Sequence, residues 1–172
     1  EASKMELSEE PVPLDDVLGE VKRLFRDKGD THGLTFDTSA TAAVTLTADR
    51  LAVKQMLINL VSNAIKFTPT GGRIDVRTRF ADDGNLELAV TDTGPGMNQE
   101  ELEQAVGAFG QTAEGRKAGG TGLGLTLTAA LAHLHGGRLD IDSLPGQGTT
   151  ATIVLPAWRL GDTGPGGAAA SR

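Results

Sequence analysis

Apolar residues recur along this chain first at helical spacing and then in strand-like alternation. Residues 14–27 carry apolar side chains every three or four positions, which predicts an amphipathic helix. Its apolar positions are Leu14, Val17, Leu18, Val21, Leu24 and Phe25. Residues 34–36 and 44–46 alternate between apolar and polar side chains, so both are predicted to be short strands.

A second helix is predicted after Asp49, whose side chain can accept a hydrogen bond at a helix N-terminus. The expected buried stripe consists of Leu51, Val53, Met56, Leu57, Leu60, Val61, Ala64 and Ile65. Pro69 disfavours helical backbone at Thr68, and the glycines that follow turn the chain.

The second half of the chain alternates hairpins with one strongly apolar helix. Residues 74–80 and 86–90 are predicted to form a hairpin, as are residues 138–143 and 149–155. The apolar run 125–134 predicts a helix, whereas residues 98–118 predict a mobile loop that contains a short helix. This order predicts an α/β fold, a two-layer sandwich whose mixed sheet is covered on one face by helices.

Composition limits the classes of protein that this chain can represent. The 172 residues include no cysteine, which excludes a disulfide framework and a cysteine-ligated metal. The formal net charge of −7 argues against broad nucleic-acid binding, and we expect no nucleic-acid partner. No apolar run approaches the ~20 residues that span a bilayer. Residues 158–172 lack a hydrophobic pattern and are predicted to be disordered.

The glycine-rich segment 118–126 precedes the apolar helix. A helix N-terminus carries unpaired N–H groups and a partial positive charge, so it attracts phosphate. Gly120, Gly122 and Gly124 remove side chains from a segment that would approach such a ligand closely. A flexible hinge in front of an ordinary helix is the alternative for this segment alone, and phosphate binding is the favoured interpretation.

Asn59, Asn63 and Lys66 are spaced to lie on one face of the second helix. Asparagine is unfavourable inside a helix, so this alignment calls for an explanation. The side-chain oxygen of Asn63 could bind a hard cation such as Mg²⁺, and Lys66 could meet a phosphate. From spacing alone, a solvated polar face explains the pattern equally well.

Asp92 continues the inward phase of the strand before it, so its carboxylate is predicted to face the core and to need a partner. The exocyclic amine of a purine would serve, and so would a local backbone cap. Gly94 and Gly96 would allow a ligand ring to approach the backbone.

Other sites do not fit the sequence. In the run 110–117, Arg116 and Lys117 stand where a Walker A loop requires Lys followed by Ser or Thr. The three histidines show no metal-ligand pattern, and His133 and His135 are expected to interact favourably with a helix C-terminus.

Taken in order, these segments resemble the catalytic ATP-binding domain of sensor histidine kinases, in the superfamily that includes gyrase B, Hsp90 chaperones and MutL. The similar motifs are an N box at 55–69 (QMLINLVSNAIKFTP), a G1 box at 92–96 (DTGPG), an F box at 109–111 (FGQ), a G2 box at 120–125 (GTGLGL) and a closing hairpin at 146–150 (GQGTT). The resemblance covers residues from about 11 to 156 and implies a Bergerat-type ATP-binding fold.

The resemblance also implies roles for individual residues. Asn63 would bind Mg²⁺ with Asn59 close to the phosphates, and Asp92 would accept a hydrogen bond from the adenine amine. These two asparagines and Lys66 are the expected catalytic residues, and residues from about 107 to 119 would form an ATP lid. The expected ATP-binding residues are Asn59, Asn63, Lys66, Phe67, Asp92, Gly94, Gly96, Met97, Phe109, Gly120, Thr121, Gly122, Leu123, Gly124, Leu125 and Thr149.

Asn59 distinguishes two branches of that superfamily. The ATPase members carry a Glu at this position that activates water, and an amide cannot accept that proton. The resemblance therefore implies a histidine protein kinase domain that donates the γ-phosphate of ATP to a histidine on a separate domain. A regulatory nucleotide-binding module and a small ATPase remain alternatives.

The same resemblance predicts a division of the chain and a set of partners. Residues 1–10 would connect to an upstream dimerisation and phosphoacceptor domain, residues 11–157 would be the catalytic domain, and residues 158–172 a tail. The expected partners are that phosphoacceptor domain and a downstream response regulator. The parent protein would be a homodimer and could be associated with a membrane. This fragment would be a cytoplasmic monomer.

Overall fold

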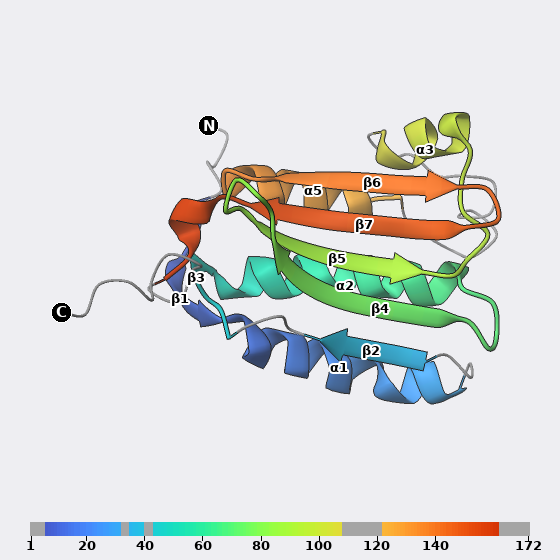
Figure 1. The fold of residues 1–172 in the computed structure, drawn as a ribbon, viewed down its shortest axis with the longest axis horizontal. Coiled ribbons are helices and arrows are strands. Elements are labelled where there is room, and N and C mark those ends of the chain that lie inside the picture. Colours follow the sequence, from blue (N-terminus) through green and yellow to red (C-terminus); the bar gives the residue numbers. More distant parts are fainter. Residues whose placement is uncertain (1–5, 32–34, 40–42, 108–121, 162–172) are drawn as a thin grey trace.

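A five-stranded sheet with helices on one face forms the body of the molecule (Figure 1). The computed structural model describes residues 6–31, 35–39, 43–107 and 122–161. The strand order is β2 (Thr35–Ser39), β4 (Arg73–Phe80), β5 (Leu86–Asp92), β7 (Gly148–Leu155) and β6 (Arg138–Leu144). β2 runs parallel to β4, and the other neighbours are antiparallel. The predicted two-layer α/β fold with a mixed sheet is confirmed.

The covering helices are α1 (Leu14–Thr31), α2 (Arg50–Phe67) and α5 (Gly124–Leu134), while the short α3 (Gln99–Val106) lies near β6 (Figure 1). Inward residues of β5 alternate with outward ones and pack under α2, as the period-two pattern predicts. α2 lies between α1 and α5 and contacts both. It is therefore the element around which the core assembles.

Both ends of α2 follow the predicted chemistry. The Asp49 carboxylate accepts a hydrogen bond from the Ala52 backbone N–H at 3.0 Å, and the helix ends at Phe67, with Thr68 as an extended C-cap before Pro69. The predicted stripe is wrong at Leu51, which is 77% exposed because it lies in the first turn, outside the face that begins at Ala52. Leu24 of α1 is likewise 54% exposed.

A second, two-stranded sheet joins β1 (Glu9–Pro13) to β3 (Thr45–Asp49). Glu9 and Glu10, the last residues of the predicted connector 1–10, are paired with β3 and so belong to the fold of the domain. Val12, a residue of β1 that is paired with Leu46 of β3, is fully buried. The N-terminal segment is therefore attached to the core before α1 begins.

Residues 158–161 also differ from the predicted disordered tail. A 3₁₀ turn, η1 (Ala157–Arg159), follows β7, and the Arg159 side chain is 3% exposed. Its guanidinium donates to the carbonyl oxygens of His135 at 2.5 Å and Thr47 at 2.7 Å, and it pairs with Glu9 at 2.8 Å. This one side chain joins β1, β3 and the end of α5.

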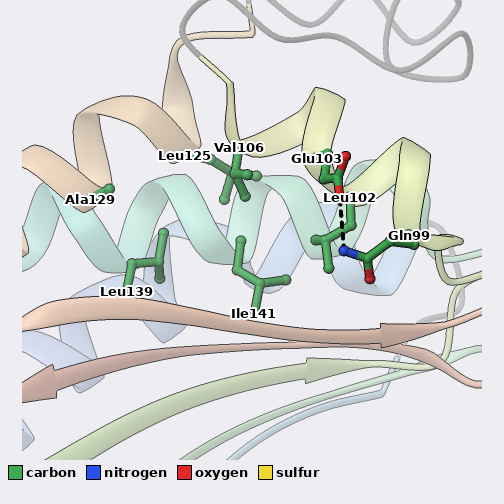
Figure 2. Close-up of a pocket in the computed structure, with 8 residues that line it drawn as sticks. All are labelled: Gln99, Leu102, Glu103, Val106, Leu125, Ala129, Leu139 and Ile141. Carbon is green, nitrogen blue, oxygen red and sulfur yellow. Dashed lines mark hydrogen bonds between the residues drawn. The ribbon is translucent and has the colours of Figure 1, made fainter.

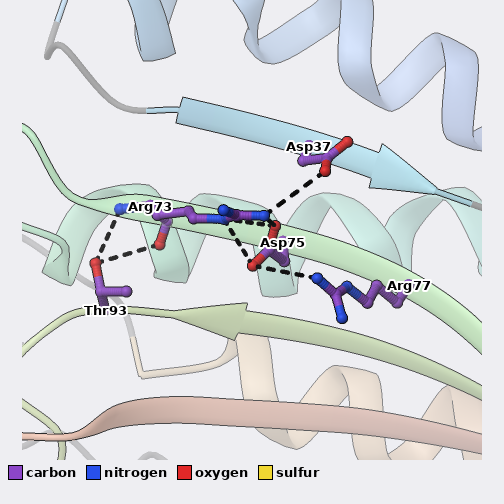
Figure 3. Close-up of polar contacts among 5 residues, drawn as sticks. All are labelled: Asp37, Arg73, Asp75, Arg77 and Thr93. Carbon is purple, nitrogen blue, oxygen red and sulfur yellow. Dashed lines mark hydrogen bonds and ion pairs between the residues drawn. The ribbon is translucent and has the colours of Figure 1, made fainter.

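The outer face of the sheet carries charged side chains (Figure 3). Arg73 donates through Nε to both carboxylate oxygens of Asp75 at 2.9 Å and lies 3.7 Å from Asp37 on β2. Arg77 extends the group at 4.0 Å from Asp75. Exposed pairs of this kind add little stability, so we assign them to keeping this face solvated.

Candidate functional site

Asp92 ends β5 on the helix-covered side of the sheet, as its phase predicts. Its side chain is buried and accepts a hydrogen bond from the Gly94 backbone N–H at 2.8 Å. Burial raises the pKa of the Asp92 carboxyl above its ordinary value, while backbone hydrogen bonds from Gly94 and Thr149 act in the opposite direction. A carboxylate has two oxygens and about four acceptor sites, so Asp92 can still accept a hydrogen bond from a ligand besides those from the Gly94 and Thr149 backbone.

The loop after Asp92 is packed too tightly for side chains. A Cβ on Gly94 would lie 2.9 Å from the Phe67 carbonyl oxygen and equally close to the Asp92 carboxylate. Gly96 has φ +68°, and a Cβ there would overlap the Leu144 carbonyl oxygen. These contacts bring the end of α2 and the β6–β7 turn against the same loop.

A hydroxyl from β6 completes this end of the site. The Ser143 hydroxyl accepts from the Met97 backbone N–H at 2.8 Å and lies 2.8 Å from the Thr149 hydroxyl. Met97, Thr149 and Asp92, three of the predicted ligand residues, are therefore joined through neighbouring strands and one loop. Sequence reasoning missed Ser143, although pairing the two arms of the predicted 138–155 hairpin would have placed it opposite Thr149.

The start of α5 meets α2 at the other end of the site. The Asn59 side-chain amide donates to the Gly124 carbonyl oxygen and to the Thr128 hydroxyl, each at 3.2 Å. Gln55 in turn donates to the Asn59 side-chain oxygen at 2.8 Å. The N box, through Asn59, and the G2 box, through Gly124, are thus in direct contact. Thr128 and Gln55 were missed, although each lies four residues from a predicted site residue.

Within the part of the chain that the structure describes, no side chain caps the N-terminus of α5. Leu123 occupies the cap position and makes no side-chain cap hydrogen bond, whereas Asp49 caps α2 and Asn98 caps α3. Gly122, just before it, has φ +72°, which glycine adopts readily. Leu123 therefore leaves the first-turn N–H groups of α5 without a cap from the usual position, and a helix start of this kind favours an anion.

Asn63 lies beside this helix start, and Lys66 follows one turn later. The Asn63 amide nitrogen is 3.9 Å from the position that a Cβ on Gly124 would take. Asn63 is partly buried, and Lys66 is exposed in the last turn of α2. From Asn59 to Phe67, α2 rises about 12 Å, so a single helix links the start of α5 to the loop at Asp92.

A separate hollow of about 320 Å³ lies between α3, α5 and β6 (Figure 2). Its walls are mainly apolar, with Leu102 and Val106 of α3 facing Leu139 and Ile141 of β6. Leu125 is the one predicted ligand residue among its lining residues. The hollow therefore borders the α5 end of the site and does not include Asp92 or Asn63.

Three predicted ligand residues, Phe109, Gly120 and Thr121, lie outside the described residues, as do the F box and most of the expected lid. His135 interacts with the C-terminus of α5, as predicted, through the carbonyl oxygen of Leu131 in its last turn. It is fully buried, with Nε2 accepting from the Asp49 backbone N–H at 3.2 Å and Nδ1 2.7 Å from the Leu131 carbonyl oxygen. These two contacts join the end of α5 to the start of α2.

The family model for histidine kinase-, DNA gyrase B- and HSP90-like ATPases matches residues 48–159. The chain belongs to this family. The matched range contains the end of β3, Asn59, Asn63, Asp92 and the start of α5, so the geometry of the site lies within the family domain. The predicted family is confirmed.

Proteins named as histidine kinases are among the relatives of this chain. The chain is 42% identical over 166 residues to the non-motile and phage-resistance protein of Caulobacter vibrioides, covering 91% of this chain and 19% of that protein. It is 41% identical over 158 residues to histidine protein kinase DivJ of the same organism, covering 91% and 26%. The chain thus spans about a fifth to a quarter of the length of these curated relatives.

Solved structures of histidine kinases share the fold. Full-length ShkA in complex with AMPPNP has a TM-score of 0.78 and 29% identity, with 90% of this chain and 32% of that chain covered. Histidine kinase ThkA in complex with the response regulator protein TrrA has a TM-score of 0.70 and 25% identity, with coverages of 87% and 42%. Among the described helices, none is both long and apolar enough to cross a bilayer.

Proposed function

We propose that this chain is the ATP-binding catalytic domain of a sensor histidine kinase, which donates the γ-phosphoryl group of ATP to a histidine on a separate domain. One observation carries the proposal: α2 connects the buried carboxylate of Asp92 to the start of α5, where Leu123 at the cap position makes no side-chain hydrogen bond. A hydrogen-bond acceptor at one end and the N–H groups of a helix start at the other match the base and the phosphates of one nucleotide. The AMPPNP complex of the similar ShkA supports this ligand class.

At the base end, the Asp92 carboxylate would accept a hydrogen bond from the exocyclic amine of adenine. Gly94, Gly96 and Met97 would line the base, with Phe67 and Thr149 beside it. These assignments are supported by the packing of the loop after Asp92 against Phe67 and Ser143, which leaves backbone rather than side chains near the Asp92 carboxylate.

At the phosphate end, the N–H groups of the first turn of α5 and the ammonium group of Lys66 would bind the triphosphate. The backbone from Gly122 to Leu125 supplies these groups. Phe109, Gly120 and Thr121 stay predictions from the sequence. Asn59 would act by holding α5 in place, since both protons of its side-chain amide already have partners on that helix.

The residues of this site also fit Mg²⁺. The described residues contain no group of three His, Asp or Glu side chains that could hold a metal ion by themselves. Mg²⁺ commonly takes one or two protein oxygens together with waters and substrate phosphates. The amide oxygen of Asn63 would be that protein ligand, and the ion would neutralise charge on the transferring phosphoryl group.

Transfer fits this site better than hydrolysis. An amide stands at position 59, and its nitrogen faces the Gly124 carbonyl oxygen, so it cannot take a proton from water. Positioning and charge neutralisation then provide most of the catalysis, and the nucleophile comes from outside the domain. A phosphoacceptor domain of the same homodimeric kinase and a response regulator would be the partners, as the ThkA–TrrA complex suggests for the latter.

Nucleotide titration tests the binding part of the proposal. Wild-type protein should bind an ATP analogue with Mg²⁺, and Asp92→Ala should abolish measurable binding. Asp140→Ala is the matched control, because Asp140 pairs with Arg138 on the exposed face. Equal affinity of wild type and Asp92→Ala would remove the base-pocket assignment.

Labelled ATP tests the transfer part. The chain alone should acquire no stable label, whereas an added phosphoacceptor domain with its histidine should become labelled. Steady phosphate release by the chain alone, lost in Asn63→Ala, would instead indicate a small ATPase. Binding without transfer to the parent's own acceptor domain would indicate a regulatory module.

A further inference from the structure

Three polar residues form a row across the sheet at the base end of the site. Asp92 on β5 is the register partner of Thr149 on β7, and Thr149 is the register partner of Ser143 on β6. Directly paired residues of neighbouring strands project to the same face, so all three lie on the helix-covered side with Asp92. The sequence motif contains Asp92 and Thr149, but the structure adds Ser143.

The Ser143 hydroxyl has one proton and three neighbours. It accepts from the Met97 backbone N–H at 2.8 Å. Its own proton can go to the Thr149 hydroxyl at 2.8 Å or to the Gly148 carbonyl oxygen at 3.2 Å. The shorter contact is typical of an O–H···O hydrogen bond, so donation to Thr149 is the better use of this proton.

The direction of that bond determines what Thr149 can offer a ligand. If Ser143 donates to Thr149, the Thr149 proton is free for another acceptor. If Ser143 donates to Gly148, Thr149 must donate back to Ser143 and can offer a ligand only lone pairs. The orientation of one hydroxyl thus decides whether Thr149 is a donor or an acceptor beside the Asp92 carboxylate.

We infer that Ser143 is a specificity-determining positioning residue, which by donating to Thr149 turns the Thr149 proton toward the ligand and so selects adenine over guanine. The inference rests on the proposed nucleotide function. An acceptor next to a donor complements the amine and the neighbouring ring nitrogen of adenine. Guanine presents a carbonyl oxygen and a ring N–H at the corresponding positions, which opposes both groups.

The test compares ATP and GTP as competitors of a fluorescent ATP analogue, in wild type and in Ser143→Ala. We expect ATP affinity to fall about tenfold, as for one lost hydrogen bond, and GTP affinity to change by less than about twofold. Loss of the Met97 contact would weaken both nucleotides equally, so the ratio isolates the effect on the base. Ser143→Thr, which keeps the hydroxyl, should retain the wild-type ratio, and Ser8→Ala, on the exposed N-terminal segment, is the matched control.

A double-mutant cycle with Thr149→Val tests whether Ser143 acts through Thr149. The double variant should discriminate no worse than Thr149→Val alone. An unchanged ATP-to-GTP ratio in Ser143→Ala, or additive effects in the cycle, would overturn the inference while leaving ATP binding intact. If thermal unfolding shows that Ser143→Ala does not fold, Ser143→Cys provides the same comparison with a weak donor. Wild-type protein that binds no ATP would overturn the proposed function, and this inference with it.

Discussion

Exchanging the Asn59 amide for a carboxylate should separate α2 from the start of α5. In the structure the Asn59 side-chain nitrogen donates to the Gly124 carbonyl oxygen and the Thr128 hydroxyl, each at 3.2 Å. Asn59→Asp keeps the shape of the side chain but replaces the donor with an acceptor. The Gly124 oxygen would then face a second oxygen across a partly buried contact.

The magnitude follows from those two hydrogen bonds. Each contributes a net ~1 kcal/mol, and unsatisfied or opposed groups add to the loss, so we expect unfolding free energy to fall by about 2–4 kcal/mol. For a domain of this size that corresponds to a melting temperature lower by about 5–12 °C. ATP affinity should fall as well, because the N–H groups of α5 would no longer be held beside Asn63.

Asn98→Asp is the matched control, because the Asn98 side chain uses its oxygen to accept from the Glu101 backbone N–H. The same chemical change there retains the acceptor at a helix N-terminus and should alter stability by less than about 0.5 kcal/mol. Both variants are measured by urea unfolding at neutral pH and again at acidic pH. The loss in Asn59→Asp should shrink at acidic pH, where the introduced carboxyl is protonated and can donate. Two variants of equal stability at neutral pH would refute the donor role of Asn59.

Three further predictions follow from other buried contacts. Because burial raises the pKa of Asp92, its ionisation destabilises the fold as pH rises through that raised pKa, and Asp92→Asn should be more stable than wild type at neutral pH in urea unfolding. Wild-type ATP affinity should fall as pH decreases through the same pKa, because the carboxylate that accepts the hydrogen bond becomes protonated. Arg159→Ala should cost about 3 kcal/mol of unfolding free energy, because it removes the side chain that donates to the buried His135 carbonyl oxygen and to the partly buried Thr47 carbonyl oxygen. The exposed Arg138→Ala should cost less than about 0.5 kcal/mol, and equal losses would contradict the role of Arg159. Gly96→Ala should lower the unfolding free energy by more than about 3 kcal/mol, since its Cβ would overlap the Leu144 carbonyl oxygen in addition to the strain of a positive φ. Gly71→Ala, with φ +82° and open space around it, should cost about 1–2 kcal/mol. Similar melting temperatures of the two variants would contradict the packing of the loop after Asp92.

Local sequence signals were sufficient for the elements whose chemistry is local. Asp49 and Pro69 set the ends of α2, and the alternation in 74–80 and 86–90 predicted β4 and β5. The inward phase of Asp92 followed from the same alternation. These features depend on residues within a few positions of one another, which a single sequence records directly.

Features that depend on distant partners were missed. Pro11 and Pro13 argue against a strand, yet β1 forms because the prolines occupy alternate positions and β3 is its one partner among the described strands. Arg159 looks like a tail residue until its carbonyl partners on Thr47 and His135 are known. Ser143 and Thr128 are ordinary residues in sequence, and only their contacts with Met97, Thr149 and Asn59 give them a role.

Backbone amide shifts on addition of AMPPNP and Mg²⁺ test the central claim most directly, because they locate the ligand along the chain. We predict the largest changes at both ends of the site, at Gly94 and Thr149 near Asp92 and at Gly124 and Leu125 at the start of α5. Changes confined to the hollow between α3, α5 and β6, with Gly94 and Thr149 unaffected, would contradict the account.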